Sequence, residues 1–221
     1  MTDTVKLPDA PDVFPPQYKI ALTGPSGSGK TTLAHIIQYH YPEIKFIAGS
    51  ADSIMGSSAQ GYLFKRFGYE PKGHANVRAM SATNPDFGFE FQRLLLNNRT
   101  NTIRKNTNFV TDRSPIDNFT YYLDQVAHNQ SPETTDDFLS QCQEAYLNLT
   151  HLIYVPSINP EGYVEDNGSR IANIWYQRKI DVLFEHNLTH YFIPYSNRVK
   201  VLFIDVWDLT ERTKLVKEFL Q

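Results

Sequence analysis

Short apolar runs alternate with segments of helical periodicity along most of the chain. The five runs that indicate strands lie at 18–22, 44–48, 108–111, 151–155 and 199–204. Between them, apolar positions recur every three or four residues, as they do on one face of a helix. Alternation of this kind favours a parallel sheet with helices on both faces. We therefore predict an α/β domain, a three-layer sandwich with about five parallel strands.

Helices are predicted where the apolar stripe is clearest. They cover 30–39, the regions around 138–149 and 171–183, and 209–220. Another helix is expected after the third strand, because Ser114 can cap it, Pro115 suits its first turn, and Asp117 places a carboxylate at its positive end. The sequence contains no internal repeat, so we expect one domain over 18–221.

Composition narrows the class of protein. The chain has 221 residues, 41% of them apolar and 13% aromatic, which suffices for a packed core and excludes disorder as the main state. A formal charge of −3 argues against a protein that coats nucleic acid. One cysteine, no run of about 18 apolar residues and no signal-like start predict a cytoplasmic protein without a membrane segment. Residues 1–17 hold four of the 13 prolines and are expected to form a flexible arm.

The segment 49–105 is too long for a plain connection within a compact sheet. We predict an inserted lobe or helical pair that binds the acceptor of a reaction. Residues 61–105 carry eight Lys/Arg and three acids, a charge of +5 against −8 for the rest. Aromatic residues are interleaved with these cations, as an anionic aromatic ligand would require, although they could instead form the core of the lobe. They are Tyr62, Phe64, Phe67, Tyr69, Phe87, Phe89 and Phe91.

A glycine-rich loop between the first strand and the first helix matches the Walker A pattern G-x-x-x-x-G-K-[ST] at every fixed position. Its residues are Gly24, Pro25, Ser26, Gly27, Ser28, Gly29, Lys30 and Thr31, followed by Thr32. Glycines let backbone N–H groups turn toward phosphates, and the helix start adds positive potential. We predict that this loop binds ATP, with Lys30 on the β- and γ-phosphates and Thr31 on Mg²⁺. Before phosphate arrives, the Lys30 ammonium is expected to face solvent.

The third predicted strand ends in the sequence Phe109-Val110-Thr111-Asp112-Arg113-Ser114. With the loop, it resembles P-loop kinases of the nucleoside and nucleoside-monophosphate type, and more narrowly the NadR-like ATP-binding domains found in phage and bacterial genomes. The resemblance implies that Asp112 is a Mg²⁺ partner or general base beside the γ-phosphate, and that Arg113 holds an acceptor oxygen. Independently, an acid at the carboxyl end of a central strand lies where ligands meet an open α/β sheet. Two plainer interpretations stay open: a helix-capping Asp112 and a surface salt bridge for Arg113.

The segment 162–170 is similar to the mobile lid of these kinases, which we place at 157–170. The resemblance implies that Arg170 and Arg178 close over the transferring phosphoryl group, where they supply charge and exclude water. If a helix starts near Arg170, both arginines face the same site, because the eight residues between them make about two turns. A solvated helix face is the alternative for each.

One position departs from the family. Many deoxynucleoside kinases have a catalytic glutamate at the end of the second strand, where this chain offers Asp52 as the only nearby carboxylate. We therefore favour Asp112 as the base and keep Asp52 as the alternative. Asp205, at the end of the last strand, is expected to be a loop residue near the adenine.

These features predict an ATP-dependent kinase that transfers the γ-phosphate to a small nucleotide-like acceptor, a (deoxy)nucleoside monophosphate. The charge of the lobe indicates an acceptor that already bears phosphate, held by Arg113 and one of Arg66, Arg78 or Arg93. A hydroxyl of DNA is the first alternative acceptor, because the positive aromatic segment suits a single strand or a flipped base. A nucleotide-hydrolysing switch is the second alternative, although the chain has no N-K-x-D guanine signature. The sequence leaves a homodimer open.

Overall fold

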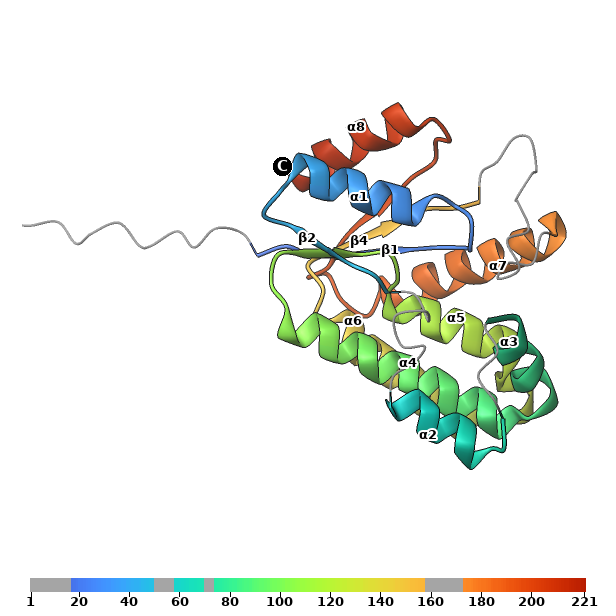
Figure 1. The fold of residues 1–221 in the computed structure, drawn as a ribbon. Helices are drawn as coiled ribbons and strands as arrows, with labels where there is room; N and C mark the ends of the chain where they lie inside the picture. Colours follow the sequence, from blue (N-terminus) through green and yellow to red (C-terminus); the bar gives the residue numbers. More distant parts are fainter. Residues whose placement is uncertain (1–16, 50–57, 70–73, 158–172) are drawn as a thin grey trace, which may run out of the picture.

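The computed structural model describes residues 17–49, 58–69, 74–157 and 173–221. Its strands form one parallel sheet in the order β2-β3-β1-β4-β5 (Figure 1). They are β1 (Lys19–Thr23), β2 (Lys45–Ile47), β3 (Phe109–Thr111), β4 (His151–Tyr154) and β5 (Lys200–Phe203). Each strand end lies within one residue of its predicted run, so the five-stranded parallel α/β sheet is confirmed.

Helices cover both faces of the sheet (Figure 1). One face carries α1 (Lys30–His40) and α8 (Leu209–Leu220). The other carries α4 (Pro85–Lys105), α5 (Pro115–Gln125), α6 (Pro132–Tyr146) and α7 (Ile174–Asn187), with a 3₁₀ turn at Ala127–Asn129 and a π-helix at Leu188–Phe192. Side chains alternate along β1: Ile20 and Leu22 pack with α1 and α8, whereas Ala21 packs on the opposite side. Within the described ranges, no helix is both long and apolar enough to cross a membrane.

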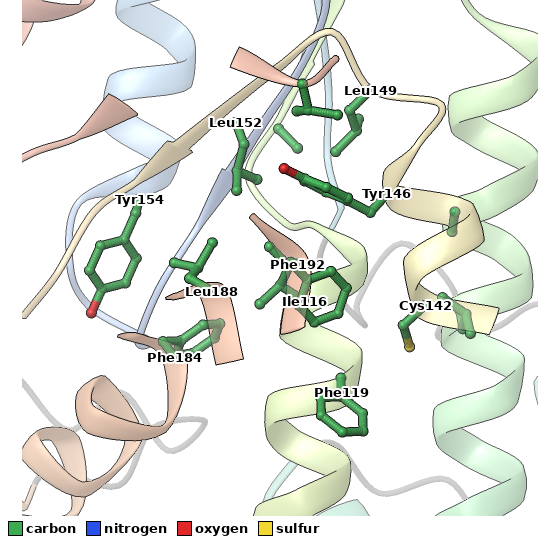
Figure 2. Packing of buried hydrophobic residues seen from close by; sticks show 14 of the residues in the cluster. Ile116, Phe119, Cys142, Tyr146, Leu149, Leu152, Tyr154, Phe184, Leu188 and Phe192 are labelled. Carbon is green, nitrogen blue, oxygen red and sulfur yellow. The ribbon is translucent and has the colours of Figure 1, made fainter. Parts of the chain in front are cut away.

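The core beneath the second face is rich in aromatic side chains. Figure 2 shows Phe119, Tyr146, Phe184 and Phe192 gathered from α5, α6, α7 and the π-helix, near Leu152 of β4. All five side chains are at most 2% exposed. Burial of these apolar side chains stabilises the packing of α7 against β4. The core therefore holds the helix that carries Arg178 in position.

The described part of the inserted segment forms three helices, where we expected a lobe or a helical pair. α2 (Ser58–Arg66) and α3 (His74–Thr83) pack on the first half of α4 around a small core of their own (Figure 1). The second half of α4 belongs to the main core, through Leu96 and Ile103. Helix α4 is therefore shared between the lobe and the layer under the sheet.

Most of the aromatics of the lobe are structural. Phe64, Phe87 and Phe91 are at most 5% exposed, and the Phe64 and Phe87 rings meet edge to face at 5.4 Å. Phe89 instead faces the main core and contacts Phe138 of α6. Tyr62 differs, because 69% of its surface is exposed. The interpretation of these residues as the core of the lobe is thus correct for the buried ones and leaves Tyr62 available to a ligand.

The turn that leaves β1 requires a glycine at position 24. Gly24 has a φ of +133°, and a Cβ atom there would lie 2.2 Å from the carbonyl oxygen of Val155. Gly24→Ala is therefore expected to lower the free energy of unfolding by about 3 kcal/mol or more, because backbone strain and overlap add. Denaturant unfolding measures this loss.

Gly61→Ala is the matched control for that substitution. A Cβ atom at Gly61 would meet nothing within 4 Å, and alanine favours helix α2, so the free energy of unfolding should stay constant or rise. Equal unfolding midpoints for the two variants would contradict the close approach of Gly24 to Val155.

Candidate functional site

The glycine-rich loop connects β1 to α1 at the carboxyl edge of the sheet. Gly29 is the N-cap residue of α1 and has a left-handed backbone conformation, with φ +90°. Lys30 and Thr31 then form the first turn of the helix. Unpaired N–H groups at a helix start and a glycine-rich turn bind anions, so the loop can hold phosphate groups.

Lys30 is buried in the loop. Its side chain is 5% exposed, and Nζ donates to the carbonyl oxygens of Gly24 (2.8 Å) and Pro25 and to Ser28 Oγ (3.2 Å). Burial, together with the neighbouring Arg113 guanidinium, lowers the pKa of Lys30 from 10.5 to about 7. The expectation that this ammonium faces solvent was wrong, because the loop carbonyls provide acceptors for it before any phosphate is present.

Thr31 and Asp112 meet beside the loop. Thr31 Oγ1 donates to Asp112 Oδ2 at 2.6 Å, and the other carboxylate oxygen accepts from the backbone N–H of Gly49 at 2.9 Å. The contact joins the start of α1 to the ends of β3 and β2. Asp112 does not cap α5, because Ser114 is the N-cap residue and forms a capping box with Asp117.

A hydroxyl and a carboxylate in contact fit Mg²⁺, which takes oxygen ligands and commonly uses only one or two side chains plus phosphate oxygens and water. Among the described residues, no group of three or more His, Cys, Asp or Glu side chains could hold a metal ion. Thr31 and Asp112 therefore suit a metal ion that is completed by a ligand's phosphates.

Arg113 points toward the loop and is held there by a buried carboxylate. Its Nη1 atom donates to Asp117 Oδ1 at 2.9 Å, and Nη2 donates to Ser26 Oγ at 3.3 Å. The guanidinium lies 5.9 Å from the centre of the Tyr121 ring. Asp117 is 2% exposed and also accepts bonds from Thr23 and Ser114, which fixes its position. Arg113 thus forms an ion pair inside the site rather than a surface salt bridge.

The predicted lid lies almost entirely outside the described residues, and so do Arg170 and Asp52. Helix α7 begins at Ile174, with Asn173 as its N-cap residue. The alignment of Arg170 with Arg178 depends on a helix start near Arg170, a position outside the described residues, so it stays a prediction. Arg178 is exposed, and its guanidinium lies 5.0 Å from the centre of the Trp175 ring.

Asp181 of α7 forms a second polar cluster at this edge of the sheet. Its carboxylate accepts from Tyr154 Oη at 2.7 Å and from the backbone N–H of Ser157 at 2.8 Å. Burial raises the pKa of Asp181 above its usual value. These contacts tie α7 to the end of β4. No sequence signal indicates this pairing, because an acid on a helix looks the same whether it faces solvent or a strand end.

Arg99 of α4 is one of the eight cations counted in 61–105, but its side chain is buried and has structural contacts. It is 8% exposed and donates to the carbonyl oxygens of Ser114 (2.8 Å) and Gly49 (3.1 Å) and to Asn118 Oδ1. Burial lowers the pKa of Arg99 to about 10. Because Gly49 and Ser114 both lie close to Asp112, Arg99 fastens the backbone around that carboxylate.

The eight cations of 61–105 do not share one surface. Arg104 and Lys105 end α4, shortly before β3 begins, so they lie at the amino edge of the sheet, opposite the loop. Arg93 pairs with Glu90 at 3.1 Å and lies over Phe89, on the side of α4 that meets α6. A 21-residue helix is roughly 30 Å long, and this length separates charges that are close in sequence. The +5 count therefore overstates the positive charge near an acceptor.

The sheet order and the loop match the P-loop fold of nucleoside kinases. Structures similar to this chain include deoxyadenosine kinase from M. mycoides with bound dCTP, at a TM-score of 0.56 and 15% identity over 91% of this chain and 98% of that one. Thymidylate kinase from Candida albicans is similar at a TM-score of 0.56 and 13% identity, over 92% of this chain and 91% of that one. At these identities the likeness concerns the fold. No protein-family model matches the chain, and no curated protein matches it.

Proposed function

We propose that the protein is an ATP-dependent kinase that transfers the γ-phosphate to a small nucleotide-like acceptor. The observation that carries the proposal is the Thr31–Asp112 contact of 2.6 Å beside a glycine-rich loop with Lys30 at its centre. The loop would bind the donor phosphates, and Thr31 and Asp112 would hold Mg²⁺. When bound, Mg²⁺ would neutralise part of the charge that develops on the phosphoryl group. A role for Asp112 as general base remains part of the proposal.

The fold supports transfer to an acceptor over a hydrolysing switch. The two similar structures are a nucleoside kinase and a nucleotide kinase, and this chain covers nearly all of each. The lobe of α2, α3 and the first half of α4 leaves Tyr62 exposed, as a base-stacking residue would be. The narrower likeness to NadR-like domains of phages and bacteria remains a prediction from the sequence.

We propose a (deoxy)nucleoside monophosphate as the acceptor. Support now comes mainly from Arg113, whose guanidinium is fixed by Asp117 and directed toward Ser26 of the loop. Arg93 was one of the three further arginines expected to bind the acceptor phosphate. It lies on the side of α4 that meets α6, which argues against that role. A phosphate placed at Arg113 would lie beside the donor loop. The binding energy of the acceptor phosphate would therefore position the acceptor for transfer.

The acceptor is tested by kinase assays with labelled ATP on nucleosides, their 5′-monophosphates and single-stranded DNA. Charge-assisted hydrogen bonds are worth roughly 1.5–3 kcal/mol, so kcat/KM should be about tenfold or more higher for a monophosphate than for its nucleoside. Equal values would contradict the acceptor. Transfer to DNA with a steep salt dependence would establish the polynucleotide alternative, and ATP hydrolysis without transfer would establish the switch.

The lid arginines are tested by Arg178→Ala and Arg170→Ala. Each is expected to lower kcat about tenfold or more with little change in ATP affinity, because charge on the transferring group is greatest in the transition state. Arg198→Ala is the matched control, since Arg198 is exposed and precedes β5 at the opposite edge of the sheet. A rise in the KM for ATP at constant kcat would rule out a role in the transition state.

A further inference from the structure

Arg212 of helix α8 is buried against the phosphate loop. Arg212 lies in the first turns of α8 and is 3% exposed. Its Nη1 atom donates to the carbonyl oxygen of Ser28 at 2.7 Å, and Nε donates to the carbonyl oxygen of Val206 at 2.8 Å. A Cβ atom on Gly29 would lie only 3.3 Å from Nη1, so the guanidinium is packed against the loop itself.

The charge of Arg212 has no counter-ion in the described part of the chain. None of the carboxylates there pairs with it, and Nη2 is buried without a hydrogen-bond partner among those residues. The Arg212 guanidinium lies over the Trp207 ring, with Cζ 4.8 Å from the ring centre, an attractive contact that leaves the net positive charge in place. A buried, uncompensated cation is costly, and its presence next to an anion-binding loop indicates that an anion completes the site.

Arg212 and Lys30 hold the loop in different ways. Lys30 contacts the carbonyl oxygens of Gly24 and Pro25, and it must leave them in order to reach a bound phosphate. Lys30 reaches Ser28 through Oγ, whereas Arg212 binds the carbonyl oxygen of Ser28, so the Arg212 contact can persist when Lys30 moves to a bound phosphate. Arg212 is therefore placed to keep the Ser28 carbonyl oxygen in position while Lys30 moves.

We propose that Arg212 is a positioning residue for the donor triphosphate. It holds the Ser28 carbonyl oxygen so that the loop N–H groups stay directed at the phosphates, and its uncompensated charge favours an anionic ligand. The inference rests on the proposed function, because it concerns the same donor site.

Arg212→Met and Arg212→Lys test this role by calorimetric titration with MgATP and with magnesium tripolyphosphate, which has phosphates but no base. Methionine removes the charge and the bond to Ser28, so both dissociation constants should rise about tenfold or more, and by similar factors. Lysine keeps the charge and should give an intermediate value. Lys214→Ala, an exposed cation on the same helix, should leave both constants unchanged.

A kinetic measurement separates positioning from a merely structural role. In Arg212→Met, the KM for ATP should rise while kcat at saturating ATP stays within about threefold, whereas loss of folded protein would lower kcat and leave KM unchanged. Unchanged binding of both ligands by Arg212→Met would overturn the inference. Failure of the unaltered protein to bind either ligand would overturn the proposed function itself.

The emission of Trp207 gives a readout that does not alter Arg212. Trp175→Phe leaves Trp207 as the only tryptophan, and it lies over the Arg212 guanidinium. Magnesium tripolyphosphate should change the emission of Trp207 in this variant, with a midpoint that matches the calorimetric dissociation constant. Binding without any change of emission would argue that the phosphates do not act on Arg212.

Discussion

Lys30→Met is expected to lower kcat by about 10³-fold while the protein without nucleotide stays folded. The loss is large because Lys30 is the cation at the centre of the loop, and one preorganised donor to developing charge is worth about 10²–10³ in rate. Folding should survive because methionine fills a similar volume and removes a buried ammonium, whose charged form is disfavoured in that position.

The same substitution should change how stability depends on pH. The pKa of Lys30 is about 7 in the folded protein against an ordinary value of 10.5, because burial disfavours the charged form. Between these values the unfolded chain binds more protons than the folded one, so the free energy of unfolding rises with pH. The gain from this group is on the order of 4 kcal/mol across the window, and it is absent below pH 7, where both states are charged.

Urea unfolding at pH 7, 8 and 9 tests this dependence on the unaltered protein and on Lys30→Met. The difference in unfolding free energy between the two should shift in favour of the unaltered protein as pH rises. Parallel pH profiles would show that Lys30 is not buried in solution, and normal turnover by the variant would contradict the phosphate loop.

The sheet could be predicted because its signals are local. Consecutive apolar residues indicate a strand of five residues such as β1. The Walker A pattern identifies the phosphate loop and the start of α1 within eight positions. The start of α5 is equally local: Ser114 was predicted as its cap and Asp117 as an acid of its first turn, and the structure joins the two in a capping box. The orientation of the Lys30 side chain could not be predicted from neighbouring residues, because it depends on the direction of the loop carbonyl groups.

The residues that the sequence did not reveal act across long separations. Arg212 and Ser28 are 184 positions apart, and Arg99 and Gly49 are 50 apart. Nothing in the neighbourhood of either arginine distinguishes a buried anchor from a surface cation. The charge count failed for the same reason, since it treated Arg99 and Lys105 alike although one is buried beside Asp112 and the other ends α4 at the far edge of the sheet.

Asp112→Asn is expected to lower kcat by two or more orders of magnitude with a small effect on folding. Asparagine keeps an oxygen that can accept from the Gly49 N–H, so the backbone around the site should hold, but the negative charge that Thr31 now contacts is lost. A metal partner and a general base predict different kinetics for this variant. If Asp112 holds Mg²⁺, the variant should need a higher Mg²⁺ concentration for half-maximal rate.

Asp52→Asn and Asp137→Asn complete the comparison in a kinase assay at several Mg²⁺ concentrations. Asp137 is exposed on α6, so its variant should keep the normal rate and the normal Mg²⁺ dependence. A fall in kcat for Asp112→Asn at unchanged Mg²⁺ dependence would assign Asp112 as the base rather than the metal partner. Full activity of Asp112→Asn together with an inactive Asp52→Asn would move the catalytic role to Asp52, a carboxylate located shortly after β2 in the sequence.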